Sequence, residues 1–244
     1  MRFLVFQHIA IEHPGVLRDF MAADGVTWDT VELDEGETIP QLDGYDALIV
    51  MGGPMDVWQE AEYPWLVAEK AAIREAVSER KLPYLGLCLG HQLLGAALGG
   101  KVGPMARPEV GILEVELTDA GRRDPLFRGI APLSKALQWH GAAVIEPPPG
   151  ALVLAQSPLC PVQAMRVGEQ AYGIQYHVEL TADTVGEWGC VPAYEQSLEA
   201  VEGPGALAHL NAAAAVGMAE FNRDARQLYD NFMALLRGRR AAAQ

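Results

Sequence analysis

The sequence contains few cysteines and few basic residues. Its three cysteines, Cys88, Cys160 and Cys190, are widely spaced and form no CxxC pair or Cys/His cluster, so we predict no zinc site. Lys and Arg number 18 against 32 Asp and Glu, and the net charge of −14 argues against nucleic acid or an anionic membrane as a partner. No apolar run approaches the roughly 20 residues of a membrane-spanning helix. These absences favour a cytoplasmic protein with free thiols.

Two nucleotide-binding signatures are also absent from the sequence. It has no GxxxxGK[ST] phosphate loop, and no GxGxxG follows the first predicted strand. We therefore predict neither an ATP-using synthetase domain nor a nucleotide-binding oxidoreductase. No cofactor is expected.

Apolar runs alternate with amphipathic segments along the first hundred residues. We expect strands over residues 2–7, 26–33, 45–51 and 81–87, and helices over residues 14–23, 60–80 and 89–98. Strands that alternate with helices indicate an α/β fold, in which helices cover both faces of a central, mostly parallel sheet. Ligands of such sheets bind beyond the carboxyl ends of the strands, and His8, Gly52, Gly53 and Cys88 all lie at such ends.

The second half of the chain changes to short β-like runs separated by turns. We expect these strands over residues 111–117, 135–139, 152–155, 162–166 and 171–176, as a small, largely antiparallel sheet. Helices are expected over residues 194–201, 207–215 and 218–236. The length and composition predict a single domain over residues 1–237, followed by a frayed tail over residues 238–244.

The segment Gly86-Leu87-Cys88-Leu89-Gly90 lies between a predicted strand and a predicted helix. The small residues on either side of Cys88 allow a sharp turn and a close approach of the neighbouring chain. The N-terminus of the following helix then points at the thiol, where free N–H groups favour a thiolate or an oxyanion. Cys88 is therefore a candidate nucleophile. Cys160 and Cys190 have no such setting, and we expect them to be structural thiols.

A cysteine nucleophile needs a base, and the base needs a group that orients it. His177 follows a strand-like run, and Glu179 comes two residues later. Residues two apart in an extended chain face the same side, so Glu179 can hold the imidazole through its far nitrogen. The alternative is a surface histidine at a strand end with a solvated glutamate nearby.

Three segments together resemble the class I (triad) glutamine amidotransferases. They are Gly86-Leu87-Cys88-Leu89-Gly90-His91-Gln92, Gln175-Tyr176-His177-Val178-Glu179 and Met51-Gly52-Gly53-Pro54. The resemblance covers the chain from Arg2 to about Leu236, and it points to the stand-alone branch that is similar to the amidotransferase domain of GMP synthase. It implies a flavodoxin-like class I amidotransferase fold.

The resemblance also implies roles for individual residues. Cys88 would be the nucleophile, His177 the general base and acid, and Glu179 the residue that orients the base. The backbone N–H groups of Gly53 and Leu89 would form the oxyanion hole. The substrate-binding residues would be Gln92, Gly52, His140 and Gly141, with no metal.

The sequence departs from the family pattern where Ala142 follows His140-Gly141, because the family usually has Asp at this position, beside the α-amino and α-carboxylate groups of the substrate. This change affects the selectivity expected for free glutamine but not the thiol chemistry. A second departure is Val178, where the family more often has Pro. Val keeps an extended backbone, so we expect little effect.

The expected activity is that of a glutamine amidotransferase or glutaminase, which hydrolyses the γ-amide of glutamine through a Cys-bound γ-glutamyl thioester and releases ammonia. Any ammonia-using synthetase would be a separate protein. An alternative is a γ-glutamyl peptidase or hydrolase on the same scaffold, which would act on another γ-glutamyl compound. A third reading, a non-catalytic binding module, is disfavoured because all three triad residues are present.

Overall fold

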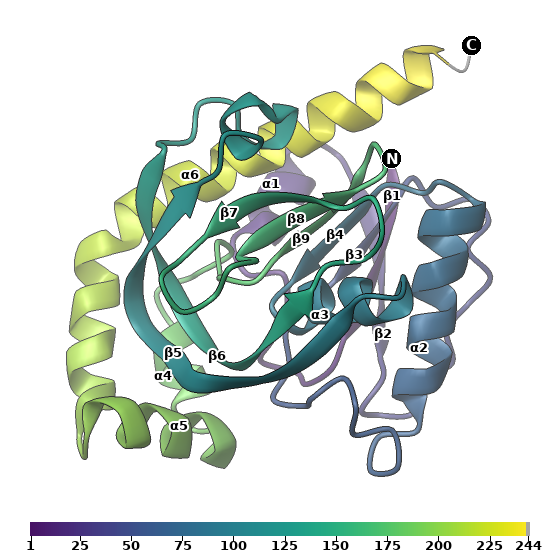
Figure 1. Ribbon diagram of the computed structural model, residues 1–244. Helices are drawn as coiled ribbons and strands as arrows, with labels where there is room; N and C mark the ends of the chain where they lie inside the picture. The colour runs from purple at the N-terminus through teal and green to yellow at the C-terminus, as the bar shows by residue number, and fades with distance from the viewer. Residues whose placement is uncertain (243–244) are drawn as a thin grey trace.

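One nine-stranded sheet runs through the computed structural model, which describes residues 1–242 (Figure 1). In spatial order the strands are β2 (Thr27–Glu32), β1 (Arg2–Gln7), β3 (Ala47–Val50), β4 (Tyr84–Leu87), β9 (Ala171–Ile174), β8 (Ala164–Val167), β7 (Leu152–Gln156), β5 (Lys101–Leu117) and β6 (Leu133–Glu146). Neighbouring strands are parallel from β2 to β9 and antiparallel from β9 to β6. The predicted α/β fold is confirmed. The antiparallel strands extend the parallel sheet through β9 instead of forming a sheet of their own.

Helices cover both faces of the parallel part. The α-helices are α1 (Leu17–Ala23), α2 (Trp65–Arg74), α3 (Leu89–Ala97), α4 (Thr184–Trp188), α5 (Pro192–Glu202) and α6 (Ala206–Ala242), and the short turns are η1 (Glu75–Glu79), η2 (Gly121–Arg123) and η3 (Pro125–Phe127). Strand β1 shows how the two faces are separated. Phe3 and Val5 pack with α1 and α6, whereas Leu4 and Phe6 pack with α2 and α3, because side chains alternate along a strand.

A third apolar cluster lies beyond the ends of the parallel strands. It joins α4, α5 and the first part of α6 to strands β5 and β6. Three aromatic rings form its centre, with centroids 6.0 Å apart for Trp139 and Trp188 and 5.6 Å apart for Trp139 and Tyr194. Trp139 Nε1 also donates to Tyr194 O at 3.1 Å. This cluster fixes α5 beside the carboxyl edge of the sheet.

Several boundaries differ from those expected. The helix expected from residue 60 begins at Trp65, directly after Pro64, and ends in the π-helical turn η1. Strand β5 begins at Lys101, ten residues earlier than expected. Its first half was not predicted because it contains two prolines, and its pairing shifts register between Pro104 and Glu109.

The C-terminal helices also differ from the expectation. The two helices expected over residues 207–215 and 218–236 are one helix, α6, which changes direction along its length (Figure 1). Helix α6 includes residues 238–242 of the segment predicted as a tail. Residues 243–244 lie outside the described residues.

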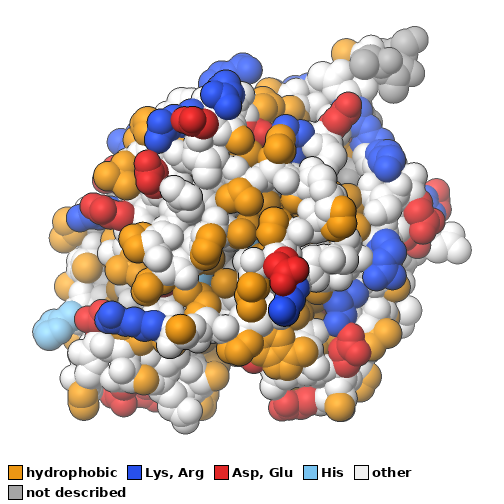
Figure 2. Space-filling view, in the orientation of Figure 1, with side chains coloured by type: hydrophobic (Ala, Val, Ile, Leu, Met, Phe, Trp, Pro, Cys, Tyr) orange, Lys and Arg blue, Asp and Glu red, His pale blue; other side chains and the backbone are white. Residues whose placement is uncertain are grey.

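The surface over the antiparallel strands mixes charges of both signs (Figure 2). Hydrophobic side chains gather near the middle of this face, and Leu133, Ile145, Leu152 and Leu159 are the exposed large ones in this part of the chain. None of the helices within residues 1–242 has the length and apolar character that a bilayer-crossing segment requires.

Candidate active site

Cys88 occupies a strained turn between β4 and α3. Its backbone has φ 49° and ψ −103°, a conformation that L-residues rarely adopt. The two flanking glycines make this turn possible. A Cβ on Gly86 would lie 2.5 Å from the carbonyl of Gly90, and a Cβ on Gly90 would lie 2.2 Å from Val50 O. The sharp turn predicted from the sequence is confirmed.

Hydrogen bonds from both neighbouring strands hold this turn. Cys88 N donates to Ile174 O at 2.8 Å, and Gly90 N donates to Met51 O at 3.1 Å. Tyr84, buried on β4, donates its hydroxyl to Gly90 O at 2.7 Å. The thiol is therefore carried by the sheet and not by a mobile loop.

His177 and Glu179 lie beside Cys88, just past the end of β9. His177 Nδ1 is 2.8 Å from Glu179 Oε1, and both side chains are almost fully buried. The second carboxylate oxygen accepts from Val178 N at 2.8 Å. Since Nδ1 faces the carboxylate, Nε2 is the nitrogen left for Cys88, the group with which His177 interacts electrostatically. The structure thus brings together the three residues predicted as a triad.

The electrostatic environment couples the thiol to the imidazole. Burial raises the pKa of Cys88, and His177 only partly offsets this effect, so the thiol needs His177 to become a thiolate. Burial by itself lowers the pKa of His177. The charges of Glu179 and Cys88 outweigh burial and hold that pKa well above its ordinary value. Glu179 therefore stabilises the positive charge that develops when His177 accepts a proton.

A cavity of about 130 Å³ opens beside the thiol. Its lining residues are Gly53, Pro54, Met55, Asp56, Cys88, Leu89, Gln92, Trp139, His140, Gly141, Ala142, Ala193, Tyr194 and Ser197. The volume is close to that of a cavity of about 150 Å³ that holds a benzene molecule, so the space suits a short side chain such as a γ-glutamyl group. Leu89 stands in the first turn of α3, where backbone N–H groups have no intrahelical acceptor.

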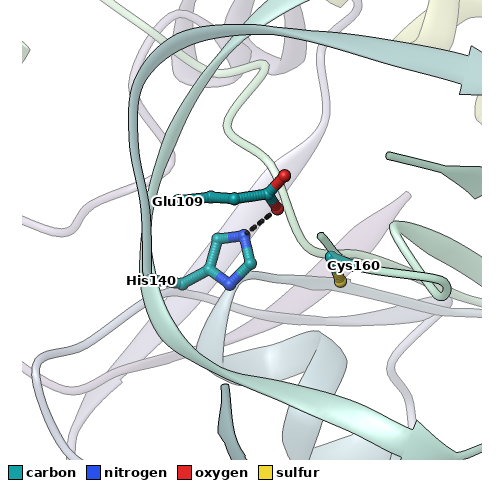
Figure 3. Close-up of side chains that lie close together, drawn as sticks. All are labelled: Glu109, His140 and Cys160. Atoms are coloured by element: carbon teal, nitrogen blue, oxygen red, sulfur yellow. Dashed lines mark ion pairs between the residues drawn. The ribbon is translucent and has the colours of Figure 1, made fainter. Parts of the chain in front are cut away.

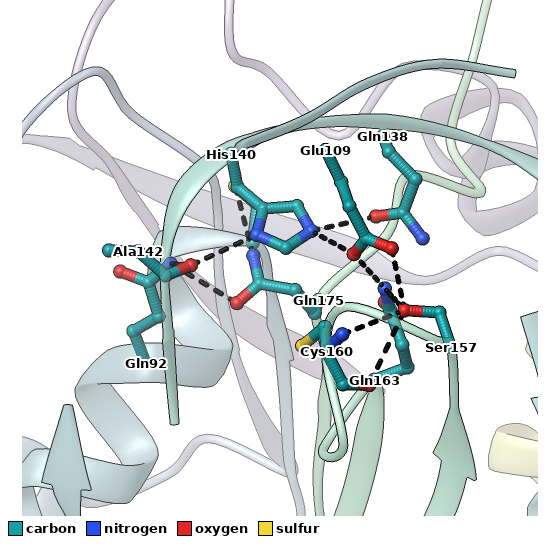
Figure 4. Close-up of polar contacts among 10 residues, drawn as sticks. Gln92, Glu109, Gln138, His140, Ala142, Ser157, Cys160, Gln163 and Gln175 are labelled. Carbon is teal, nitrogen blue, oxygen red and sulfur yellow. Dashed lines mark hydrogen bonds and ion pairs between the residues drawn. The ribbon is translucent and has the colours of Figure 1, made fainter. Parts of the chain in front are cut away.

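Gln92 and His140 fix the wall of this cavity (Figure 4). Gln92 Nε2 donates to Ala142 O and to Gln175 Oε1, each at 3.1 Å. His140 Nδ1 donates to the same carbonyl at 2.9 Å. Gln175 Nε2 in turn lies 3.6 Å from Cys88 Sγ. The predicted pocket residues Gln92, His140 and Gly141 do line the cavity, although the amide nitrogen of Gln92 is already used by the protein.

One cluster of neighbouring side chains in the described residues carries atoms that could bind a metal (Figure 3). Glu109, His140 and Cys160 place one ligand atom each within 4.8 Å of one another, and this donor set suits first-row metals. However, Glu109 already accepts from Ser157 Oγ at 2.6 Å and Gln163 Nε2 at 2.8 Å, and it lies 3.2 Å from His140 Nε2. Because these donors satisfy the carboxylate, we assign no metal to the cluster.

The two other cysteines differ in their setting. Cys160 is buried, as expected of a structural thiol, whereas Cys190 is exposed in the turn after α4. His91, which belongs to the same motif as Cys88, is fully buried, and burial lowers its pKa to about 4. A Cβ on Gly173 would lie 2.6 Å from its Nδ1, so His91 packs against β9. It is not among the described residues that line the cavity.

A second carboxyl group, which the sequence did not indicate, lies beside the triad. Glu12 is 1% exposed and accepts a hydrogen bond from the Tyr194 hydroxyl. Burial raises the pKa of Glu12, and the charge of His177 is the largest effect that opposes this rise. A Cβ on Gly52 would lie 2.0 Å from Glu12 Oε2 and 3.4 Å from His177 Cε1. A side chain at position 52 would therefore displace the carboxyl group of Glu12.

Gly52, predicted to bind substrate, is not among the described residues that line the cavity. Its carbonyl instead accepts from Nδ1 of the buried His8 at 2.7 Å. His8 Nε2 is 2.9 Å from Glu69 Oε1, and neither side chain of this pair is exposed. Burial by itself lowers the pKa of His8, but the charge and hydrogen bond of Glu69 outweigh it and raise that pKa.

The raised pKa of His8 predicts how stability depends on pH. The folded protein holds the His8 proton more tightly than the unfolded chain does. The stabilisation is therefore fully present below the ordinary value of 6.5 and is lost as the pH rises through the folded pKa. Glu69→Gln removes the main charge that raises this pKa, and Glu12 exerts a weaker effect of the same sign.

We expect the melting temperature of the wild type to be higher than that of Glu69→Gln, with the largest difference near pH 6. This difference should shrink steadily toward pH 9. Thermal unfolding followed by circular dichroism at several pH values measures this difference. A difference that stays constant over the range would show that the His8 proton does not contribute.

The comparisons with known proteins agree with this geometry. A sequence model described as "Glutamine amidotransferase class-I" matches residues 16–187. The glutamine amidotransferase-like protein YfeJ of Salmonella typhimurium is 33% identical over 211 residues, which cover 83% of this chain and 85% of YfeJ. One subunit of the glutamine-hydrolyzing GMP synthase of Sulfolobus acidocaldarius is 32% identical over 153 residues, which cover 62% of this chain and 77% of the relative.

Solved structures show the same similarity. A glutamine amidotransferase from Thermotoga maritima superposes with a TM-score of 0.84 at 27% identity, covering 95% of this chain and 97% of the other. A glutamine amidotransferase from Methylobacillus flagellatus gives a TM-score of 0.83 at 27% identity, with coverage of 96% and 94%.

Proposed function

The chain belongs to the class I glutamine amidotransferase family, and from this premise we propose that it hydrolyses the γ-amide of glutamine through a thioester on Cys88 and releases ammonia. One observation carries the proposal. A cysteine at positive φ lies between a buried His–Glu pair and a cavity of about 130 Å³. This arrangement supplies a nucleophile, a base and a space for the acyl group.

In the first half of the reaction, Cys88 Sγ attacks the amide carbon while its proton passes to His177. The negative charge that develops on the amide oxygen is stabilised by the N–H groups of Gly53 and Leu89. Such donors contribute strongly, because removing one typically costs about 10²–10³ in rate. His177 then gives its proton to the leaving nitrogen, the C–N bond breaks, and ammonia departs from a γ-glutamyl thioester.

In the second half, water attacks the thioester and gives up a proton to His177. The C–S bond breaks, glutamate leaves, and the thiol is restored. Glu179 holds His177 through Nδ1 in both halves of the reaction. These steps use Cys88, His177, Glu179 and the N–H groups of Gly53 and Leu89.

The relatives suggest a use for the ammonia. Several of them are named as one subunit of GMP synthase, and such a name implies at least one other polypeptide in the complete enzyme. We propose that this chain delivers ammonia to a separate synthetase of the same general kind.

A γ-glutamyl peptidase is the second candidate, and Ala142 favours it. Relative to the family pattern, this residue removes a carboxylate from the cavity wall. The acyl half of the substrate is unchanged in such an enzyme, and only the leaving amine differs.

Product release by the purified chain tests the proposal. Free glutamine, a set of γ-glutamyl dipeptides and glutathione are offered in parallel, with Cys88→Ala as the control. Ammonia and glutamate from glutamine, with the peptides intact, support a glutaminase. Cleaved peptides with little ammonia support a peptidase. If neither substrate class is turned over even with a candidate synthetase present, the proposed hydrolysis is wrong.

Position 142 offers a test of selectivity. Among the described residues, Asp56 is the only carboxylate that lines the cavity, and burial raises its pKa. An aspartate at position 142 would add a second acceptor for the α-ammonium group of glutamine. Charged hydrogen bonds contribute about 1.5–3 kcal/mol, so we expect Ala142→Asp to lower KM for glutamine about tenfold or more.

Ala142→Asn is the matched control, because it has nearly the same size without the charge, and we expect KM to stay near the wild-type value. Steady-state kinetics with glutamine measures all three proteins. An unchanged KM in Ala142→Asp, or an equal decrease in Ala142→Asn, would contradict a role for charge at this position.

A further inference from the structure

His8 is a buried histidine that the proposed reaction does not use. It lies directly after β1 and N-terminal to the residues matched by the family model. Its ring stacks on Trp65 with centroids 5.5 Å apart and planes 21° apart. Nδ1 lies 2.7 Å from Gly52 O and Nε2 lies 2.9 Å from Glu69 Oε1. Packing and two hydrogen bonds therefore fix both the position and the rotation of the ring.

The partners of His8 determine where its protons lie. A backbone carbonyl can only accept, so Nδ1 must carry a hydrogen that it donates to Gly52 O. Nε2 faces the carboxyl group of Glu69 and shares one proton with it, in a pair that is closed to solvent. The donor toward Gly52 is thus present in either protonation state of the pair.

The Gly52 carbonyl belongs to the same peptide unit as the Gly53 N–H. The structure contains no cis peptide bond in the described residues, and in a planar trans peptide the C=O and N–H bonds point in opposite directions. A donor that holds Gly52 O on the side of His8 therefore turns the Gly53 N–H to the opposite side. Gly53 lines the cavity together with Cys88 and Leu89.

Gly53 itself is closely held between His8 and α3. A Cβ at this position would lie 3.0 Å from His8 Cβ and 3.0 Å from Leu89 Cδ2. The Leu89 N–H is fixed by the start of α3, whereas Gly53 belongs to a loop with two successive glycines and has no such support. The Gly53 N–H therefore needs a restraint from outside its loop, and His8 is positioned to provide it.

We propose that His8, oriented by Glu69, is a positioning residue that sets the Gly52–Gly53 peptide so that the Gly53 N–H stabilises the oxyanion. The inference rests on the proposed function, in which Cys88 attacks a carbonyl group. His8 does not touch the reacting atoms. It acts through one backbone carbonyl.

Two reagents separate this role from general effects on the site. p-Nitrophenyl acetate acylates a thiol when Sγ attacks the ester carbon and p-nitrophenolate leaves, a reaction that passes through an oxyanion. Iodoacetamide alkylates a thiol when Sγ displaces iodide from a methylene carbon, and no oxyanion forms. Both rates are measured under single-turnover conditions in a Cys190→Ala background, because Cys190 is exposed and would also react.

Two substitutions divide the contacts of His8 between them. His8→Asn places an amide nitrogen near the position of Nδ1, so it keeps the donor to Gly52 and loses the contact with Glu69. His8→Gln reaches the position of Nε2, so it keeps the contact with Glu69 and loses the donor to Gly52. Melting temperatures establish that each variant is folded.

We expect His8→Gln to slow acylation by about 10²-fold, the effect typical of a lost oxyanion donor, and to leave alkylation unchanged. We expect His8→Asn to acylate within about threefold of the wild-type rate. Equal acylation by His8→Gln and the wild type, or a parallel loss of acylation and alkylation, would overturn the inference. So would a His8→Asn variant that is as slow in acylation as His8→Gln.

Should His8→Gln fail to fold, His8→Leu takes its place, because it fills similar space and has no donor for Gly52. A loss of acylation of about 10²-fold with normal alkylation supports the role. Acylation within about threefold of the wild-type rate overturns it. Neither reagent is a γ-glutamyl compound. If the variants show this pattern of rates but the protein cleaves no γ-glutamyl substrate, the proposed function is wrong and the inference about His8 still holds.

Discussion

Replacing Cys88 with alanine is expected to abolish hydrolysis of glutamine and of every other γ-glutamyl substrate, by about 10⁴-fold or more, because no covalent intermediate can form. The fold should survive. Alanine keeps the Cβ, so the backbone at φ 49° is neither relieved nor further strained. We expect the melting temperature to stay within about 4 °C of wild type, the shift that about 1 kcal/mol gives in a protein of this size. Ammonia release and thermal unfolding measure the two effects.

Cys190→Ala is the matched control for this prediction. Cys190 is exposed in the turn after α4, so its removal should change neither activity nor stability. If Cys88→Ala retains more than about one percent of the wild-type rate while Cys190→Ala is normal, the thioester mechanism is wrong. Detection by mass spectrometry of a γ-glutamyl adduct on Cys88 is an independent check.

His177→Ala is expected to lower kcat by about 10³-fold or more. In the proposed mechanism the imidazole takes the thiol proton and then protonates the leaving nitrogen, and general acid–base catalysis alone contributes about 10²–10⁴. Loss of its charge also removes the partner that offsets the burial of Cys88, so the pKa of the thiol should rise further. His209→Ala, which changes an exposed histidine on α6, is the control and should have no effect.

Glu179→Gln should lower kcat by about ten- to a hundredfold, a smaller loss than that expected for His177→Ala. The two carboxylate oxygens of Glu179 accept from His177 Nδ1 and Val178 N, and a glutamine has only one oxygen for these two donors. Because Glu179 raises the pKa of His177, the acid limb of the pH–rate profile should move to lower pH in the variant. A loss as large as that of His177→Ala, or an unmoved acid limb, would contradict an orienting role.

Much of the candidate site could be predicted because its signals are local in sequence. The two glycines around Cys88 and the two-residue spacing of His177 and Glu179 are short patterns that follow directly from the geometry of a turn and a strand. The same holds for the alternation of strands and helices that predicts the α/β fold. Each of these patterns involves only a few neighbouring residues. The structure confirms the turn and the fold.

The features that could not be predicted depend on contacts between distant segments. Glu12 meets Tyr194 across 182 residues, and His8 meets Glu69 across 61. A buried glutamate has no sequence pattern that distinguishes it from a solvated one, since burial is decided by the packing of other segments. For the same reason the sequence did not indicate that β9, which was expected in a separate antiparallel sheet, would also pair with β4 and join the antiparallel strands to the parallel sheet.

The position of β9 between β4 and β8 determines when the site can form during folding. Leu87 and Ile174 are paired in the β4–β9 ladder, and Gln175 contacts Cys88 across 87 residues of sequence. Contacts of such separation form late, because loop closure must precede them. During synthesis, Cys88 also leaves the ribosome well before His177, because it comes earlier in the chain. We expect the thiol to remain unactivated until β9 docks, so that reactivity appears only in the completed molecule.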